Sequence, residues 1–431
     1  MNSISSKTSS QGPSRMLLGL SYDLWFLSIA GFFLNVASVI AFAVTPIFLR
    51  LQFGTNDLAI GTLEGVVEAF ALIVRAFSGM VSDWIGRRKI VVLWGYGTCL
   101  LARFLLAPAT IIEIVIASRF TEKLGNGMQA SPREAFISDM VEPEKLGQAY
   151  SLNKTWSMAG SATGGIVILY MGFVTSYRPT SLWDLRGLLW FAAVSTLMST
   201  SILWGLVRDT GQKKVETKVQ TGGLREKTKQ VLADLKEFSP VFWGCLGVVC
   251  LFKMGLFSGT ILMARLRDVG VTFVGHVLSK QTELLSNGVF QIIQCTASIS
   301  LAYFLGSLFD RVDCRWILAV GFSFMMIALA IFAFGTMSFH MYIGVMFYGF
   351  QYSIHGSLMA WLSKAMPKHL YGTGFGVFFV ASGLSVMASN FLMRALTIRY
   401  TLETAFTIIG CIIFCGLCLL PFTPSFKKKK A

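Results

Sequence analysis

The sequence predicts an all-α membrane protein with twelve transmembrane helices in two pseudo-symmetric six-helix bundles. Three observations support this fold class. Of the 431 residues, 54% are hydrophobic and only 14% are charged, whereas about a quarter of the residues in a soluble domain are charged. Apolar runs of the length that a bilayer requires, about 20 residues, recur along the whole chain. Two motifs also recur at nearly the same offset, which indicates an internal duplication.

The apolar runs divide into six spans on either side of a polar stretch. We expect spans near 24–50, 58–82, 89–107, 110–132, 147–174, 187–207, 240–264, 277–305, 316–336, 338–362, 370–395 and 402–421. This gives a leader (1–23), an N-terminal bundle (24–207), a linker (208–239), a C-terminal bundle (240–421) and a Lys-rich tail (422–431). The leader lacks the apolar core and cleavage site of a signal peptide, so we expect it to remain.

The distribution of Lys and Arg predicts the orientation in the membrane. With both termini in the cytoplasm, the cytoplasmic segments hold 23 of these residues and the opposite side holds 7. Cytoplasmic loops carry such an excess, so the net charge of +15 indicates membrane orientation and not nucleic-acid binding. The tail residues 427–430 are all Lys. They fit either contact with anionic lipid or a solvated tail.

Other function classes are not supported by the sequence. No GxxxxGK[ST] phosphate loop occurs, so we expect neither ATP hydrolysis nor an enzyme. Most of the eight cysteines lie in apolar runs, so neither a disulfide framework nor a zinc site is expected. We expect no cofactor and no metal site. The expected partners are a small-molecule or ion substrate and the lipid bilayer.

The first repeated motif follows spans 2 and 8. GMVSDWIGRRK begins at Gly79, and GSLFDRVDCRW begins at Gly306. Each has an Asp four residues after the Gly and an Arg four or five residues after the Asp. Asp83 and Asp310 are 227 residues apart.

The second repeat lies at the start of spans 5 and 11. LGQAYSL contains Gly147 and YGTGFGV contains Gly372, and these glycines are 225 residues apart. Two unrelated motifs at nearly one offset imply a duplicated six-helix unit. Duplicated halves that enclose a central site are the architecture of many secondary transporters.

The motif GMVSDWIGRRK resembles the signature between helices 2 and 3 of the major facilitator superfamily, G-x-x-x-D-R/K-x-G-R-R/K-R/K. The matching residues are Gly79, Asp83, Gly86, Arg87, Arg88 and Lys89, with Trp84 in place of a basic residue. In the superfamily this loop pairs with neighbouring helix ends and stabilises the outward-open state. The resemblance implies a gating role for Asp83 and Arg87. The weaker second copy comprises Gly306, Asp310, Arg311 and Arg315. The alternative is that both are ordinary positive-inside loops.

The stretch RFTEKLGNGMQASPREAFISD, which begins at Arg119, resembles a helix-4 signature of one branch of the superfamily. That branch includes magnetosome-membrane transporters of the MamH type, which are linked to iron supply for magnetite formation. Asn126 and Gln129 depart from the signature by losing charge, which leaves anion binding by this helix open. The resemblance implies transport of iron, free or chelated, in the bacterial inner membrane or the magnetosome membrane. Ser161 replaces a Pro that is usual in antiporters, which weakens a drug/proton antiport interpretation.

Charged side chains on helix 2 are candidates for proton coupling. Glu64, Glu68 and Arg75 fall within about 40° of one helix face. The seven-residue separation of Glu68 and Arg75 predicts that no direct bridge forms between them. Burial favours the protonated form of a carboxylate, so Glu64 and Glu68, with Glu283 on helix 8, are the proton-coupling candidates. A structural ion pair with Arg103 or Arg119 is an equally weighted alternative.

Polar stripes on helices 8 and 10 predict a water-accessible pathway. The stripe on helix 8 comprises Lys280, Glu283, Asn287, Gln291 and Gln294, within about 80°. The stripe on helix 10 comprises Tyr348, Gln351, Tyr352 and His355, within about 100°. Polar residues in a membrane span usually face the bundle interior or a wetted cavity.

The candidate substrate-facing residues contain more cations than anions, which suits an anionic or chelated solute. They are Asn35, Arg75, Arg103, Arg119, Lys253, Lys280, Asn287, Gln291, Gln351, Tyr352 and His355. In the superfamily helices 1, 4, 7 and 10 line the cavity, so the resemblance favours Asn35, Arg119, Lys253 and His355.

The sequence therefore predicts a secondary active transporter that works by alternating access, and we expect proton coupling. One alternative is a non-transporting membrane scaffold or receptor that recruits protein partners through the 208–239 linker. A second alternative is a lipid or amphiphile flippase.

Overall fold

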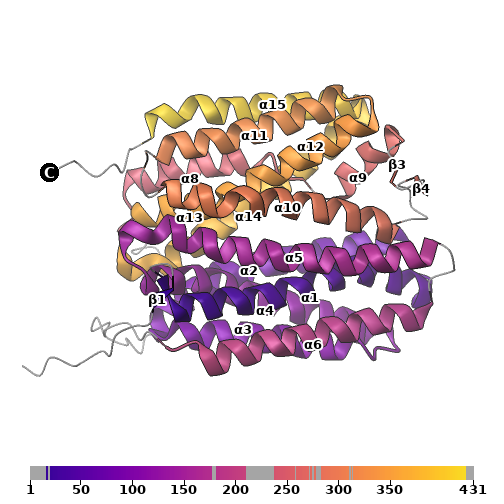
Figure 1. Ribbon diagram of the computed structural model, residues 1–431, viewed down its shortest axis with the longest axis horizontal. Coiled ribbons are helices and arrows are strands. Elements are labelled where there is room, and N and C mark those ends of the chain that lie inside the picture. Colours follow the sequence, from indigo (N-terminus) through magenta and orange to yellow (C-terminus); the bar gives the residue numbers. More distant parts are fainter. Residues whose placement is uncertain are drawn as a thin grey trace, which may run out of the picture.

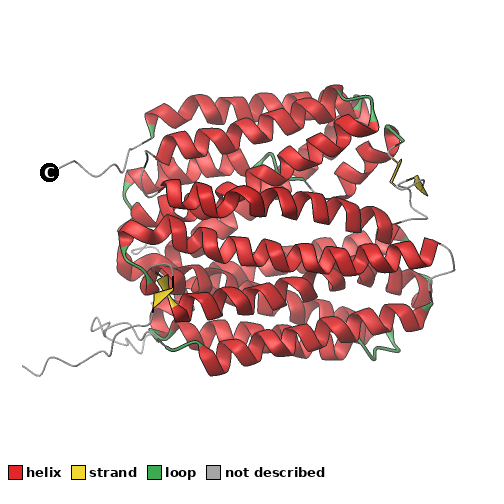
Figure 2. Cartoon of the chain, viewed as in Figure 1, coloured by secondary structure: helices red, strands yellow, loops and turns green. Residues whose placement is uncertain are grey.

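The computed structural model describes residues 16–17, 20–176, 181–209, 237–257, 259–270, 272–273, 276–277, 283–309, 312 and 314–423. Nearly all of them are helical (Figure 2). The first half comprises α1 (Tyr22–Phe53), α2 (Asp57–Ile85), α3 (Arg88–Leu106), α4 (Ile112–Met140), the 3-10 helix η1 (Pro143–Lys145), α5 (Leu146–Ser176) and α6 (Leu182–Leu206). The second half comprises α8 (Pro240–Lys253), α9 (Gly259–Asp268), α10 (Glu283–Phe309), α11 (Cys314–Phe334), α12 (Ser338–Phe350), η2 (Gln351–Ile354), α13 (His355–Lys364), η3 (Lys368–Leu370), α14 (Tyr371–Arg399), α15 (Leu402–Leu419) and η4 (Leu420–Phe422). Two short antiparallel hairpins complete the chain, β1 (Met16–Leu17) with β2 (Leu20–Ser21) and β3 (Thr272–Phe273) with β4 (His276–Val277).

These helices confirm the twelve-span prediction. Within the described ranges, nine helical segments are long and apolar enough to cross a membrane. The other three spans miss that criterion for physical reasons. Several charged residues lie along α4, and each of the other two spans is interrupted, one between α8 and α9 and one at η2. The charged helix α4 also extends to Met140, eight residues beyond the predicted end.

Side chains from other helices bind backbone groups at the interruption after α8. The Phe257 N–H donates to the Tyr348 hydroxyl at 3.0 Å, and the Ser389 hydroxyl donates to the Met254 carbonyl. A bilayer offers no partner for an unpaired backbone group, so a broken helix persists there only where protein groups or water replace the lost hydrogen bonds. The two broken helices are therefore tied together by Tyr348, a residue of α12 that contacts the loop after α8.

The turn between α2 and α3 is short because of a glycine. Gly86 has φ +67°, a backbone conformation that residues with a Cβ rarely adopt, and its N–H donates to the Ser82 carbonyl. Glycine is the usual residue at this position after a helix. Because α3 begins at Arg88, the basic residues of the motif lie at the end of the molecule that Asp83 also occupies.

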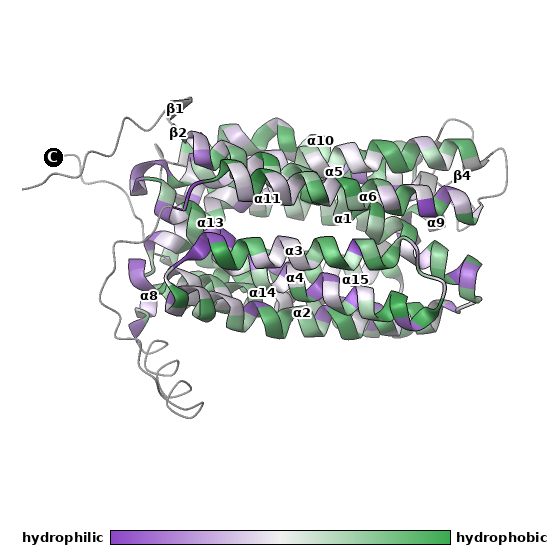
Figure 3. Cartoon of the chain, turned by 90° about the horizontal axis from the view of Figure 1, so that it is seen from below, coloured by the Kyte–Doolittle hydropathy of each residue, from purple (hydrophilic) through white to green (hydrophobic). Residues whose placement is uncertain are grey.

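The two halves lie against each other along α5 and α10, which run side by side through the middle of the molecule (Figure 1). In that view α3 and α6 lie on the outer side of the first half, and α11 and α15 lie on the outer side of the second. Seen from below, hydrophobic residues cover much of the length of the helices, while hydrophilic segments gather toward the helix ends (Figure 3). This distribution fits a multi-pass membrane protein.

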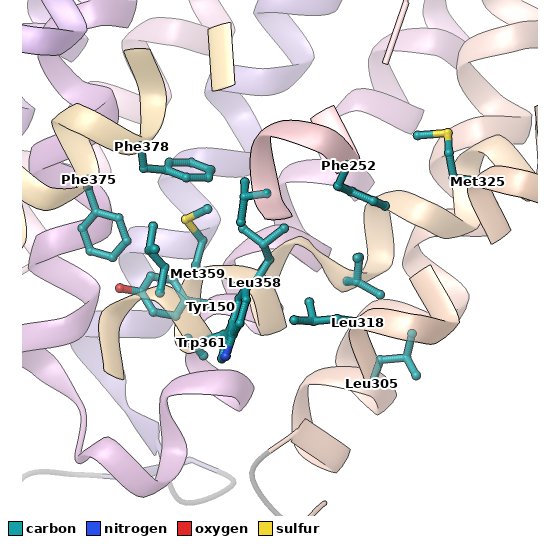
Figure 4. Close-up of a cluster of buried hydrophobic side chains, with 14 of the residues drawn as sticks. Tyr150, Phe252, Leu305, Leu318, Met325, Leu358, Met359, Trp361, Phe375 and Phe378 are labelled. Carbon is teal, nitrogen blue, oxygen red and sulfur yellow. The ribbon is translucent and has the colours of Figure 1, made fainter. Parts of the chain in front are cut away.

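Buried hydrophobic side chains join the halves at one end. Figure 4 shows Tyr150, from α5, with its ring near Phe375, from α14. The two ring centroids are 6.1 Å apart in an edge-to-face arrangement, which contributes about 0.5–1.5 kcal/mol beyond the area that it buries. Trp361 and Met359 of α13 are fully buried in the same cluster. This end of the interface is therefore closed by packed side chains.

Parts of the predicted domain plan lie outside the described residues. These are most of the leader (1–23) and the tail (422–431), and residues 210–236 of the linker (208–239). The boundaries of the two bundles, 24–207 and 240–421, coincide within two residues with the start of α1, the end of α6, the start of α8 and the end of η4.

Candidate functional site

Asp83 closes one end of the interface between the halves. Its carboxylate accepts hydrogen bonds from the backbone N–H of Gly372 at 3.2 Å, and from the backbone N–H and hydroxyl of Thr373 at 2.7 and 3.0 Å. These groups lie in the first turn of α14, where N–H groups have no partner within the helix. The flanking residue, Leu370, provides no side-chain cap. Asp83 of the first half therefore caps a helix of the second half, and the helix dipole favours its negative charge there.

The buried partner of Asp83 is Arg88, and Arg87 lies elsewhere. The Arg88 side chain is 2% exposed and lies 3.3 Å from Asp83 and 2.5 Å from Asp139. The Arg87 side chain is 64% exposed and pairs with Asp209 at 3.3 Å. We predicted that Arg87 acts together with Asp83 in gating, but the ion pair with Asp83 is formed by the next residue, Arg88. Asp139, the last residue of the helix-4 stretch, was not among the predicted site residues.

Both copies of the motif place a glycine against the opposite half. A Cβ on Gly79 would lie 1.9 Å from the Gly372 carbonyl oxygen, and a Cβ on Gly306 would lie 2.7 Å from the Gly147 carbonyl oxygen. These four glycines are those of the two sequence repeats, and each crossing joins a glycine of the first repeat to a glycine of the second. The duplication is therefore visible as two equivalent helix crossings, α2 on α14 and α10 on α5. In the second copy Asp310 and Arg311 lie outside the described residues, and Arg315 donates to the Pro421 carbonyl at 2.9 Å.

A buried charge network holds the first half together. Arg119 of α4 donates to Glu64 of α2 at 2.7 Å and also pairs with Glu122. Arg103 of α3 lies 3.5 Å from Glu122 and donates to Ser38 of α1 at 2.7 Å. The side chains of Arg103 and Arg119 are 1% and 2% exposed. These two arginines, predicted to face substrate, are instead surrounded by partners within their own half.

The second acid of helix 2 is also paired. Glu68 contacts Lys123 of α4 and lies 3.5 Å from Arg75. The expectation that Glu68 and Arg75 are too far apart for a direct bridge was wrong. Residues seven positions apart lie on the same face of a helix, and two long side chains span the two turns between them. Glu64 and Glu68 thus have the geometry of the structural alternative, in which a cation holds each carboxylate.

A different arrangement occurs at the centre of the molecule, beside the breaks of the second half. Lys154 of α5 lies over the ring of Tyr352, 5.5 Å from its centroid. The rings of Tyr348 and Tyr352 are 5.9 Å apart. Lys253 ends α8, immediately before the interruption that Tyr348 caps. His355, the first residue of α13, is within electrostatic reach of Lys154 and Lys253, and also of Arg133 on α4.

The cations of this group have few anionic neighbours. Lys154 and Lys253 form no ion pair with any described residue, although Lys154 interacts electrostatically with Glu134. Glu134 itself pairs with Arg133 at 3.3 Å. We call Arg133, Lys154, Lys253 and His355 the central basic cluster. It contains side chains from both halves and a single acidic neighbour among the residues that the structure describes.

The predicted polar stripe of helix 8 lies partly beside this cluster. Lys280 lies outside the described residues, and Glu283 begins α10 although its side chain is not described. Gln291 packs on α5, where a Cβ on Gly165 would lie 3.2 Å from the Gln291 Cβ, and its amide donates to the Cys295 thiol at 3.0 Å. Asn287 is half-buried one turn away. The stripe thus follows the contact between α5 and α10.

The remaining candidates of helices 1 and 10 differ in their contacts. Asn35 is half-buried, and its amide donates to the Gly31 carbonyl of its own helix at 2.8 Å. Gln351 is 1% exposed. Its Nε2 makes no hydrogen bond of normal geometry with any described residue. Gln351 therefore lies buried beside Tyr352 in the break of helix 10, and its side chain interacts with that of Tyr352 without normal hydrogen-bond geometry.

Lys154 and Arg133 are site residues that the predicted set does not contain. Lys154 is a lone cation within an apolar span, which is the signal that could have included it, because a charge in a membrane is costly and usually functional. Arg133 lies within the helix-4 stretch, where it reads as part of a loop rather than of a helix. Its position became apparent only because α4 continues to Met140.

Two six-helix halves, a shared interface and broken helices beside a central polar cluster define a secondary transporter. The chain belongs to the Major Facilitator Superfamily, whose family profile matches residues 26–390. An uncharacterized MFS-type transporter of Methanocaldococcus jannaschii is 21% identical over 374 residues, which are 86% of this chain and 88% of that protein. The family and this relative are transporters, so the chain is a transporter and not an enzyme.

Solved structures have the same fold. The human organic anion transporter MFSD10 superposes with a TM-score of 0.70 at 14% identity, covering 92% of this chain and 98% of that chain. A bacterial homologue of the iron transporter ferroportin, in an outward-facing state, superposes with a TM-score of 0.68 at 16% identity, covering 93% and 98%. At these identities the likeness concerns the fold alone.

Proposed function

We propose that this protein transports small organic anions by alternating access, with the central basic cluster as its substrate site. The observation that carries the proposal is the pair of central lysines, Lys154 and Lys253, which form no ion pair with any described residue. An unpaired charge within the membrane is costly, so such groups are retained where a ligand or a pathway needs them. A carboxylate or another oxyanion between the two halves would neutralise both lysines.

The surroundings of the lysines favour the same substrate class. Lys154 and His355 offer hydrogen-bond donors, and the buried Gln351 Nε2 offers another. The aromatic rings of Tyr348 and Tyr352 lie beside these donors. Donors on an aromatic wall suit an organic anion with an apolar body. The human organic anion transporter with the same fold agrees with this class of solute.

Broken helices support the location of the site. In secondary transporters, substrate groups are commonly bound where a membrane helix is interrupted, near the middle of the bilayer. Here the two interruptions lie in helices 7 and 10, and Tyr348 links them. Lys253 and His355 flank these interruptions in the sequence. A small movement at either interruption would therefore move Lys253 or His355, the side chains that we propose to bind the substrate.

Alternating access requires a gate, and we assign it to the Asp83 end of the interface. Contacts between the halves there include Asp83 with Thr373, the Ser131 hydroxyl with the Gly372 carbonyl at 2.8 Å, and Gln148 with Tyr303 at 2.7 Å. With both termini cytoplasmic, this is the cytoplasmic end, and the conformation is closed on that side. Arg88 is the cation of this gate in our proposal, whereas the Arg87 side chain is exposed at the surface.

Proton coupling is proposed to involve the paired carboxylates of the first half. Protonation of Glu68 would release Lys123 and Arg75, and protonation of Glu64 would release Arg119. The Glu68 side chain is 45% exposed, compared with 24% for Glu64. Glu68 is therefore the more accessible of the two carboxylates, and Glu283 is kept as the candidate of the second half.

Iron enters this proposal as an anionic chelate. The basic groups of the central cluster suit a complex such as ferric citrate better than a bare divalent ion, which prefers carboxylate and histidine ligands. The superposition with a ferroportin homologue is compatible with an iron cargo. A location in the bacterial inner membrane or the magnetosome membrane, and protein partners at the 208–239 linker, are further proposals.

An uptake assay with the full chain in proteoliposomes tests the proposal. The probes are radiolabelled succinate, citrate, benzoate and ferric citrate, each with and without a proton gradient. We expect at least one anion to accumulate above the level of empty liposomes. We expect Lys253→Met to raise the KM for that anion about tenfold, because one charge-assisted contact is lost. Lys368→Met, which removes the same charge from an exposed residue of η3, should leave KM unchanged. Uptake of none of the anions would exclude the proposed function.

A further inference from the structure

Resting on the function proposed above, we propose that Lys154 and Lys253 make this protein an obligatory anion exchanger. The halves would reorient rapidly only when an anion lies between the two lysines. Net movement of anion in one direction, which needs the empty protein to return, would be slow. This mode of transport would result from two like charges that lie on opposite halves.

The two lysines belong to different halves of the molecule and lie beside one connected set of residues. Lys154 lies on α5 of the first half and Lys253 at the end of α8 of the second. Lys154 reaches across the interface to the ring of Tyr352, 5.5 Å away. That ring is 5.9 Å from Tyr348, whose hydroxyl accepts from the Phe257 N–H at 3.0 Å, four residues beyond Lys253. A continuous set of contacts thus joins the surroundings of the two lysines.

Neither charge forms an ion pair with a described protein group. Lys253 interacts electrostatically with Lys154, and both act on His355. The nearest acid of Lys154 is Glu134, which is engaged with Arg133 at 3.3 Å. By contrast, Lys123 on α4 contacts Glu68 directly. The chain therefore contains lysines with and without a partner carboxylate, and both central lysines lack one in the part of the chain that the structure describes.

The absence of ion pairs at Lys154 and Lys253 affects the energy of the closed state through which the protein must pass. Between its two open states a rocking transporter passes through a state that is closed at both ends, where water is largely excluded from the centre. The repulsion between two like charges grows as the surrounding dielectric constant falls. An empty site therefore opposes closure, whereas a bound anion changes the repulsion into two attractions. A ligand that stabilises only the closed intermediate accelerates reorientation in both directions.

The buried amide of Gln351 adds an independent indication that an anion occupies this place. Its Nε2 is a hydrogen-bond donor, lies next to Tyr352, and makes no hydrogen bond of normal geometry with a described residue. It interacts with the Tyr352 side chain, but not in the geometry of a full hydrogen bond. A poorly satisfied buried donor destabilises the empty protein, and an oxyanion held by the two lysines would supply a better acceptor. Gln351 is thus a further group whose environment improves when the site is filled.

Efflux from preloaded proteoliposomes tests the inference. Vesicles that contain the full chain are loaded with whichever of radiolabelled succinate, citrate or benzoate the uptake assay identifies. They are then diluted into buffer with or without the same unlabelled anion. For the natural sequence we expect efflux to be at least about tenfold faster with external anion, because each reorientation needs a ligand. For Lys253→Met and Lys154→Met we expect this ratio to fall below about threefold, because one charge no longer opposes closure of the empty site.

Two control variants separate charge from structure. Lys253→Arg keeps the charge and should keep the tenfold ratio, while Lys368→Met removes a charge outside the centre and should also keep it. Equal efflux in the two buffers for the natural sequence would overturn the exchange mode while leaving anion transport intact. An unchanged tenfold ratio in both Lys→Met variants would equally overturn the role of the lysines. Absence of any anion transport would refute the proposed function, and the exchange mode with it.

Discussion

The two halves arose from one repeated unit, yet helices α2 to α4 of the first half and the broken helices of the second half handle charge differently. On α2, α3 and α4 the buried cations have carboxylate partners, as in the contacts of Arg119 with Glu64 and of Lys123 with Glu68. In the second half Lys253 forms no ion pair with a described residue, and the helices beside it are interrupted. Internal pairing stabilises a bundle as a rigid body, whereas unpaired groups at a helix break remain available to a ligand. In our proposal the ion-paired helices α2, α3 and α4 therefore supply rigidity, and the broken helices of the second half, with Lys154 of α5, supply groups that recognise the substrate.

The largest expected effect comes from removing one cation from each half, Arg119 from the first and Lys253 from the second. We expect Arg119→Met to lower the free energy of unfolding by about 3–5 kcal/mol, because Glu64 and Glu122 lose their partner in a buried position. Lys253→Met should leave the stability unchanged or raise it, because no protein carboxylate loses a partner. Thermal unfolding of both purified variants in detergent measures the difference. Equal loss of stability in the two variants would remove the distinction between the halves.

A smaller effect is expected at the interface that the halves share. Gly79→Ala places a Cβ 1.9 Å from the Gly372 carbonyl oxygen, so α2 and α14 must separate. Such overpacking costs about 1–3 kcal/mol and should favour opening of the Asp83 end. A cysteine introduced at Ala76 should then react faster with an impermeant reagent that is applied on that side. Mass spectrometry measures the labelled fraction.

The same helix provides the control for this variant. A Cβ on Gly65 would meet no atom within 4 Å, so Gly65→Ala should leave the labelling at position 76 as it is in the natural sequence. The equivalent change on the second half, Gly306→Ala, should open the gate in the same way as Gly79→Ala if the crossings are equivalent. A gate that responds to Gly79→Ala alone would show that the repeat is no longer symmetric in function.

The smallest effect concerns two adjacent arginines at the end of the first half. Arg88→Gln should slow transport, because Asp83 and Asp139 both lose a buried partner. Arg87→Gln removes only an exposed pair with Asp209, and such pairs contribute about 0–1 kcal/mol. Initial uptake rates of the two variants measure the contrast. A stronger effect of Arg87→Gln would return the gating role to the residue that the motif resemblance indicates.

Much of the fold could be predicted because membrane spans are a property of short segments. Every span was placed near its observed position, since about 20 apolar residues in a row have few alternatives to a membrane helix. The interruptions at η2 and between α8 and α9 could not be predicted this way. A break is stabilised by contacts from other helices, such as the Tyr348 hydroxyl at Phe257. Those contacts are set by packing between segments that are distant in the sequence.

The candidate site was less predictable for the same reason. Helical spacing correctly placed Glu64, Glu68 and Arg75 on one face, but it could not show that Arg119 and Lys123 approach from α4. It also gave no means to decide which cations find a carboxylate. The central basic cluster emerges only when Lys154 of α5 is brought to Tyr352 of the other half. Pairing between helices, and not position along one helix, separates structural charges from those left for a substrate.

The interruptions of helices 7 and 10 have a consequence for how such a protein changes its cargo over evolution. The segments that follow Lys253 and precede His355 are short, and the backbone after Lys253 is secured by contacts from neighbouring helices. Substitutions there can reshape the binding groups without disturbing the ion-paired bundle on which folding of the first half depends. New specificities are therefore expected to accumulate at these two breaks, while the paired charges of α2, α3 and α4 change together or not at all.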